Sequence, residues 1–149
     1  MTATPAFIQT DDPDFPGWQS WRLSDPTRFN ALMGKMLVRF DEPLARVRMF
    51  PEHQHTNLQD RVHGGVTLAF IDMALFAGSR MFGLIEAGTA VTLDLSIQFI
   101  GAGKPHEALD AEVELLRETR RLLFLRGLVT QGTDKVAAFA GTIRKPTAS

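Results

Sequence analysis

The chain has 149 residues, of which 44% are hydrophobic and 22% charged, as in an ordinary globular domain with a sizeable core. Its formal net charge of −1 argues against nucleic acid as the main partner, and the lack of cysteine excludes disulfides and thiol chemistry. No apolar run approaches the roughly 18 residues of a membrane-spanning helix, and the N-terminus does not resemble a secretory signal. We therefore expect a soluble, cytoplasmic protein that binds neither nucleic acid nor membrane.

The first 28 residues show no clear helical or strand periodicity. Residues 1 to about 17 are rich in Pro, Asp and Thr, a composition typical of a loop. A short helical turn is expected at SDPTRF, residues 24–29, and Gly34 closes it. The pattern predicts an N-terminal arm over residues 1–28 and one folded domain over residues 29–145.

A β-hairpin is predicted next. The segments MLVRF and LARVRMF, residues 36–40 and 44–50, alternate apolar and basic side chains and are separated by the turn-forming DEP. This alternation places Arg39, Arg46 and Arg48 on faces that meet solvent or a partner.

The apolar run from Gly65 to Phe82 predicts a long helix. Its length and its content of Ala, Leu, Met and Phe favour a helix over a strand. At a rise of 1.5 Å per residue it would span roughly 27 Å. Because the run is apolar nearly all round, we expect other structure to wrap it.

Four strand-like runs follow the helix and are joined by short, turn-rich connections. In VTLDLSIQF, Leu93, Leu95, Ile97 and Phe99 alternate with polar residues, and three further runs cover residues 108–116, 121–129 and 135–144. The order predicts an α+β domain in which an antiparallel sheet of about six strands wraps one central helix. No second layer remains to cover the other side of that helix, so we expect a homodimer or a dimer of dimers.

Asp72 is the one charged residue inside the apolar stretch VTLAFIDMALFAG. Its helical neighbours three and four residues away are all apolar: Leu68, Ala69, Leu75 and Phe76. Burying an unpaired carboxylate is costly, so this acid is either paired with an arginine across an interface or kept for chemistry. We favour a catalytic role for Asp72.

His63, Gly64 and Gly65 lie where the helix is expected to begin. Glycine lets a ligand approach the backbone closely, and the free N–H groups and positive dipole end of a helix favour a polarised carbonyl or an anion. A Gly-Gly pair alone is also typical of an ordinary loop-to-helix corner, so its meaning depends on its neighbours.

Those neighbours have fixed spacings within HTNLQDRVHGGVTLAFID. Asn57 lies six residues before His63, and Asp72 lies nine residues after it. In this motif the chain resembles the hotdog-fold acyl-CoA thioesterases, specifically the phenylacetate-degradation (PaaI-like) branch. The resemblance covers about Phe29 to Lys145 and implies the hotdog fold, an acyl-CoA substrate and hydrolysis of its thioester.

The resemblance also implies roles for individual residues. Asp72 would be the catalytic carboxylate, acting as general base on water or as nucleophile. The Gly64 N–H would bind the thioester carbonyl, and Asn57 of the opposite subunit would help to place the water. His63 would shape the turn through hydrogen bonds, and the Thr92 hydroxyl would assist.

No cofactor or metal is expected, because a carboxylate and N–H donors suffice for this hydrolysis. The spacing of His53, His55 and His63 fits no standard metal site. Gly65 is expected at the substrate. Candidates for the acyl pocket are Met73, Phe76, Phe70 and Phe99, each of which suits a plain hydrophobic core equally well.

One position departs from the family pattern, which commonly has Gly three residues after the Asn, whereas this chain has Asp60. A left-handed backbone position tolerates Asp better than most residues, so the loop is expected to keep its conformation.

A non-catalytic acyl-CoA-binding domain, a sensor or regulator, stays open as the alternative function. A hotdog hydratase is disfavoured because its Asp/His pairing does not match these spacings.

Overall fold

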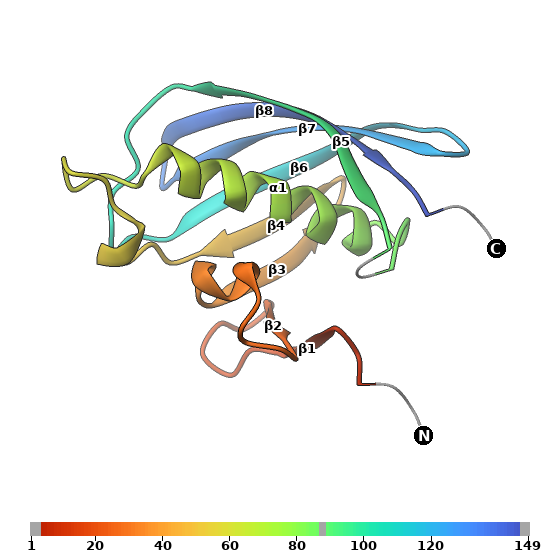
Figure 1. Cartoon of the computed structure of the whole chain (residues 1–149), viewed down its shortest axis with the longest axis horizontal. Helices are drawn as coiled ribbons and strands as arrows, with labels where there is room; N and C mark the ends of the chain where they lie inside the picture. Colours follow the sequence, from red (N-terminus) through yellow and green to blue (C-terminus); the bar gives the residue numbers. More distant parts are fainter. Residues whose placement is uncertain (1–3, 87–88, 147–149) are drawn as a thin grey trace.

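The computed structural model describes residues 4–86 and 89–146, and shows one long helix lying across an antiparallel sheet (Figure 1). Its elements are β1 (Phe7–Asp11), β2 (Gln19–Leu23), the 3-10 turn η1 (Phe29–Met33), β3 (Met36–Asp41), β4 (Leu44–Met49), the 3-10 turn η2 (His53–His55), α1 (Gly64–Met81), β5 (Val91–Phe99), β6 (Leu109–Glu118), β7 (Leu122–Gln131) and β8 (Asp134–Arg144). The strand order is β1-β2-β3-β4-β6-β7-β8-β5, so β1 and β5 form the two edges. The predicted α+β arrangement is confirmed, with eight strands in the described residues rather than about six.

The two additional strands correct the prediction of a loose arm. Within the described residues 4–28, β1 and β2 pair as an antiparallel hairpin, and β2 continues the sheet onto β3. The Trp18 ring contacts the guanidinium groups of Arg39 and Arg48, whose Cζ atoms lie 4.5 and 4.4 Å from the ring centroid. The strands are short and rich in polar residues, so their order comes from contacts with β3 and β4 rather than from a local pattern.

The predicted hairpin is present as β3 and β4, and its arginines bind carboxylates. Arg48 donates from Nε and Nη2 to the two carboxylate oxygens of Asp110 at 2.6 and 2.9 Å, and Arg46 donates to Glu112 at 2.9 Å. Both acids lie directly opposite these arginines on β6. Cross-strand pairs of opposite charge therefore line the face of β4 and β6 that points away from α1.

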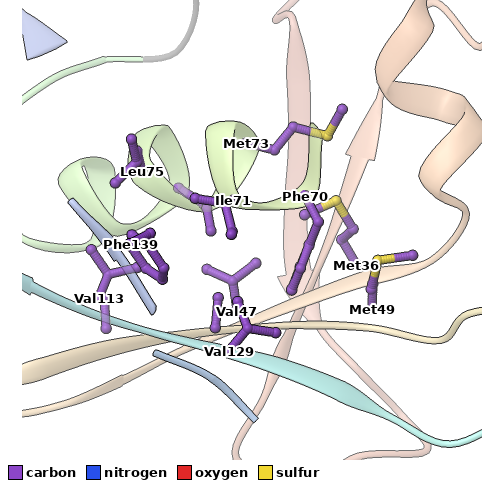
Figure 2. Close-up of a cluster of buried hydrophobic side chains, with 14 of the residues drawn as sticks. Met36, Val47, Met49, Phe70, Ile71, Met73, Leu75, Val113, Val129 and Phe139 are labelled. Atoms are coloured by element: carbon purple, nitrogen blue, oxygen red, sulfur yellow. The ribbon is translucent and has the colours of Figure 1, made fainter. Parts of the chain in front are cut away.

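α1 packs one side against the sheet and so forms the hydrophobic core. Phe70, Ile71 and Leu75 are fully buried among strand residues such as Val47 (Figure 2). Gly141 of β8 lies beneath the helix, and a Cβ built there would lie 2.5 Å from Leu75 Cδ1, so a larger residue would require the Leu75 side chain to move. Because Phe70 is fully buried in this cluster, this candidate for the acyl pocket belongs to the core.

The other side of α1 keeps a stripe that the sheet does not cover. Gly65 and Leu68 are exposed, and Asp72, Phe76 and Arg80 are half-buried, at the spacing of one helix face. Leu68 is 46% exposed, although it is apolar. The expected wrapping of the helix is thus incomplete within one chain.

The edge strand β5 contains a bulge that breaks its predicted alternation. Leu95 and Ile97 pack on the core as expected, but the register with β8 shifts between Thr92 and Asp94, and Leu93 turns to solvent. The extra residue puts Thr92 on the helix-facing side of the sheet, opposite buried Ile143.

Candidate active site

Asp72 lies in the middle of the uncovered stripe of α1. The Thr92 hydroxyl donates a hydrogen bond of 2.7 Å to Asp72 Oδ1. Across the described residues no donor reaches Asp72 Oδ2, so this oxygen is free to accept a proton or contact a ligand. This contact places Thr92, expected from the resemblance to assist the reaction, beside Asp72.

A cavity of about 220 Å³ opens beside Asp72, between α1 and the β1–β2 hairpin. Met73 and Phe76, two of the candidates for an acyl pocket, line it from the helix. Phe7 and Trp21 line it from the hairpin, stacked with ring centroids 4.4 Å apart and planes 10° from parallel. The remaining lining residues are Asn30, Arg80, Ile85, Glu86 and Ala90.

Phe7 and Trp21 are the aromatic residues of this cavity that the sequence analysis did not single out, and Asn30, Arg80, Ile85, Glu86 and Ala90 were not singled out either. The segment of the two aromatic residues looked like a loop, and only one signal distinguished it: it holds both tryptophans of the chain, Trp18 and Trp21. Large aromatic side chains in a segment without periodicity indicate burial against some other element, but they do not identify that element.

The N-terminus of α1 presents one free backbone donor. His63 is the N-cap, and its Nδ1 accepts a hydrogen bond of 2.8 Å from the Gly65 N–H. The Gly64 N–H has no acceptor anywhere in the part of the chain that the structure describes. A Cβ at Gly64 would contact only the Phe99 ring, at an ordinary 3.6 Å, so the fold itself does not require glycine there.

The loop before this corner is ordered by Asn57. Its Oδ1 accepts hydrogen bonds from the Gln59 and Arg61 N–H groups at 2.9 and 3.2 Å. Asp60 has a φ of +58°, the left-handed conformation that the sequence comparison with the family anticipated. Asp60 thus adopts the left-handed backbone conformation expected at this position.

The predicted catalytic residues lie in two separate regions of the chain. Asp72 and Thr92 meet beside the smaller cavity, whereas Asn57 and His63 line a separate, open cavity of about 870 Å³. Gly64 precedes Asp72 by eight residues on α1, which at 1.5 Å per residue separates them by about 12 Å along the helix. One chain therefore does not bring these residues to one reacting group.

His55 is a structural residue. Its ring is buried, Nδ1 accepts from the Glu52 N–H at 2.9 Å, and Nε2 lies 2.6 Å from the Leu32 carbonyl oxygen. The Nδ1 bond thus caps η2 itself, and the Nε2 contact joins η2 to η1. Within residues 4–86 and 89–146, no three His, Cys, Asp or Glu side chains are arranged to hold a metal ion.

The sequence profile described as "Thioesterase superfamily" matches residues 59–138, more than half of the chain. The match includes all of α1 and the strands from β5 to β7. The chain belongs to the thioesterase superfamily. The prediction of a thioesterase is thereby confirmed.

Solved structures of similar proteins confirm the hotdog fold and the PaaI-like resemblance. TT0310 protein from Thermus thermophilus has a TM-score of 0.68 and 25% identity, with 83% of this chain and 99% of that chain covered. A mutant of the phenylacetic acid degradation protein PaaI from the same organism has a TM-score of 0.67 and 25% identity, over 81% and 99%. The protein smu.793 from Streptococcus mutans UA159, bound to acetyl CoA, has a TM-score of 0.63 and 22% identity, over 74% and 89%.

No curated protein sequence matches the chain significantly. Among the helices of the described residues, none is long and apolar enough to cross a membrane.

Proposed function

We propose that this protein hydrolyses acyl-CoA thioesters to a free acid and coenzyme A, with Asp72 as the catalytic carboxylate. One observation carries the proposal: Thr92 holds this carboxylate at the mouth of a mainly apolar cavity, on the open stripe of a helix that is otherwise core. Membership of the thioesterase superfamily supports the reaction class. The acetyl CoA bound to smu.793, a protein of the same fold, supports coenzyme A as the thiol.

Asp72 Oδ2 accepts a proton from water as the water oxygen attacks the thioester carbonyl carbon. The carbonyl oxygen becomes an oxyanion, the carbon–sulfur bond breaks, and the proton passes to the departing thiolate. In a second route the carboxylate itself attacks the carbonyl carbon, and water then hydrolyses the resulting anhydride. Both routes use the same free oxygen, while Thr92 orients the carboxylate through the other.

The oxyanion needs a donor, and the Gly64 N–H supplies it. This group lies at the positive end of the α1 dipole and is free of other acceptors within the described residues. His63 contributes by holding the turn through its bond to the Gly65 N–H, rather than as a base. Asn57 uses Oδ1 within its own loop, which leaves its amide N–H groups to position the attacking water.

A homodimer, or a dimer of dimers built from it, brings Asp72 and Thr92 of one chain to Asn57, His63 and Gly64 of the other. The separation of about 12 Å along α1 is too large for Gly64 and Asp72 of one chain to touch one thioester. A two-fold axis that sets two α1 helices antiparallel brings Gly64 of each chain to Asp72 of the other. Such an arrangement also covers exposed Leu68 on the open stripe.

Within this site, Met73 and Phe76 line the acyl pocket, and exposed Gly65 lets the substrate approach the helix corner. The chemistry needs no cofactor beyond coenzyme A itself. A carboxylate activates the water and a backbone N–H stabilises the oxyanion.

A panel of acyl-CoA substrates with a thiol-reactive dye tests the proposal, and the absence of cysteine removes background from the protein. We expect turnover of at least one member, with loss of that turnover in Asp72→Asn. Tight binding without turnover of any member would overturn hydrolysis and support a sensor or regulator instead.

A further inference from the structure

Two cavities meet at the stacked pair of Phe7 and Trp21. The first is the cavity of about 220 Å³ beside Asp72, and the second, of about 660 Å³, lies among β2, η1 and the start of β3. Phe7, Trp21, Asn30 and Met73 line both cavities. The stack is thus a boundary between the small space at the carboxylate and a larger space behind it.

The hairpin that carries this stack is held firmly to the rest of the chain. Trp18, 6% exposed, contacts the guanidinium groups of Arg39 and Arg48. The Asp12 carboxylate, in the turn of the hairpin, is buried and accepts from Lys35 Nζ at 2.8 Å. These contacts fix both ends of the β1–β2 turn, so the aromatic pair is a fixed wall rather than a loose cover.

Resting on the acyl-CoA hydrolysis described above, we propose that the Phe7–Trp21 stack is the end wall of the acyl pocket and restricts the enzyme to short acyl groups. The acyl group extends from the carbonyl at Asp72 into the smaller cavity and ends against the two rings. A longer chain finds room only in the larger cavity, which it cannot enter without displacing Phe7 or Trp21. Aromatic rings offer apolar surface, so the end of the acyl group that meets them is apolar.

Shortening Phe7 joins the two cavities and so changes which substrates fit. Each additional buried methylene strengthens binding about fourfold, so a chain longer by several methylenes gains much once it has a space to fill. In Phe7→Ala we expect the kcat/KM ratio of dodecanoyl-CoA to butanoyl-CoA to rise at least ~10-fold over wild type. Phe7→Leu, which removes less volume, should show a smaller rise.

Ile8→Ala is the matched control, because Ile8 is the next residue of β1, is 36% exposed and points to the opposite face of the sheet. Its chain-length ratio should equal that of wild type. An unchanged ratio in both Phe7 variants, with their melting temperatures close to wild type, would overturn the end-wall assignment.

A second measurement does not depend on turnover. Trp18→Phe leaves Trp21 as the only tryptophan of the chain, so its fluorescence reports on the wall directly. Non-hydrolysable thioether analogues of acyl-CoA should change this emission when their alkyl group is long enough to reach the ring. Bound analogues of every length that leave Trp21 emission unchanged would refute the proposal, even if Phe7→Ala fails to fold.

The two proposals fail in different ways. A wild-type protein that hydrolyses no acyl-CoA contradicts the reaction, while the Trp21 titration still decides whether the stack ends the pocket. A wild-type protein that hydrolyses long and short acyl-CoA equally contradicts the end wall and leaves the reaction intact.

Discussion

Thr92 Oγ1 lies 2.7 Å from Asp72 Oδ1 and thereby joins the edge strand β5 to the middle of α1. The contact depends on the bulge in β5. With strict alternation, Thr92 would share the face of Asp94, away from the helix, and the inserted Leu93 reverses this. One extra residue in the strand therefore aims the hydroxyl at the carboxylate.

Thr92→Val tests this relationship, because valine keeps the shape of the side chain and loses only the hydrogen bond. A hydrogen bond to a charged group contributes roughly 1.5–3 kcal/mol, so we expect kcat to fall about 10- to 100-fold if the bond orients Asp72 during the reaction. Steady-state acyl-CoA hydrolysis measures the change, and thermal melting should show a folded variant.

Thr142→Val is the control for that experiment. Thr142 lies on the neighbouring strand β8, beside Asp94 and on the other face of the sheet, so its loss should leave kcat unchanged. If Thr92→Val also keeps full activity, Thr92 serves only to link β5 to α1.

The helix and its acid were predictable because their signals are local. The apolar run that forms α1 is too long for a strand, and the observed helix differs from the predicted one by a single residue at each end. Asp72 was conspicuous because its helical neighbours three and four residues away are all apolar, and in the structure it is half-buried on the stripe of α1 that the sheet does not cover.

The parts that could not be predicted depend on contacts distant in sequence. β1 and β2 are five-residue strands with mixed polar composition, and their order comes from pairing with β3 and from Trp18 against Arg39 and Arg48. The direction of Thr92 depends on a bulge that no local alternation reveals. The cavity beside Asp72 could not be predicted for the same reason, since the β1–β2 hairpin supplies one of its walls.

Asp72→Asn should abolish most turnover and leave the fold intact. The amide has almost the same size as the carboxylate but neither accepts a proton nor attacks the carbonyl, so hydrolysis should fall by at least ~10²-fold. Asn57→Ala should cost less, because Asn57 only positions the water. Asp94→Asn on the exposed side of β5 is the control and should be fully active. A fully active but destabilised Asp72→Asn protein would make Asp72 a structural acid.

The two glycines at the start of α1 should respond differently to alanine. At Gly64 a Cβ meets only the Phe99 ring at 3.6 Å, so Gly64→Ala should melt near the wild-type temperature while its methyl group hinders the substrate and lowers kcat/KM. At Gly65 a Cβ would lie 3.0 Å from His63 Nδ1, so Gly65→Ala should disturb the cap and lower the melting temperature. Equal melting temperatures for both variants would contradict this distinction.

The ion pair that holds the hairpin should give the melting temperature an acid-sensitive component. The hydrogen bond from Lys35 is the largest influence on Asp12 and holds the pKa of that carboxyl below its ordinary 3.8. Because the folded pKa is the lower one, the pair stabilises the fold above pH 3.8 and this contribution is lost as pH falls below that value. Lys35→Met should therefore melt at a lower temperature than wild type at pH 7, with a gap that narrows near ~pH 3.

Thermal melts from ~pH 3 to ~pH 7 measure that gap. Lys104→Met is the control, because Lys104 is exposed and makes no ion pair within the described residues, so its difference from wild type should not vary with pH. A gap for Lys35→Met that stays constant over the whole range would show that Asp12 does not depend on this lysine.

Subunit complementation tests whether the site is shared between two chains. We expect the Asp72→Asn chain to be inactive by itself, and also a chain that carries both Asn57→Ala and Gly64→Ala. In a mixed dimer, one of the two sites combines Asp72 of the second chain with Asn57 and Gly64 of the first, and is intact. After equal mixing and subunit exchange, half of the dimers are mixed, so activity should recover to about one quarter of wild type. A sedimentation measurement that shows a monomer at micromolar concentration, or mixed dimers without recovered activity, would place all of the catalytic groups in one chain and contradict the shared site.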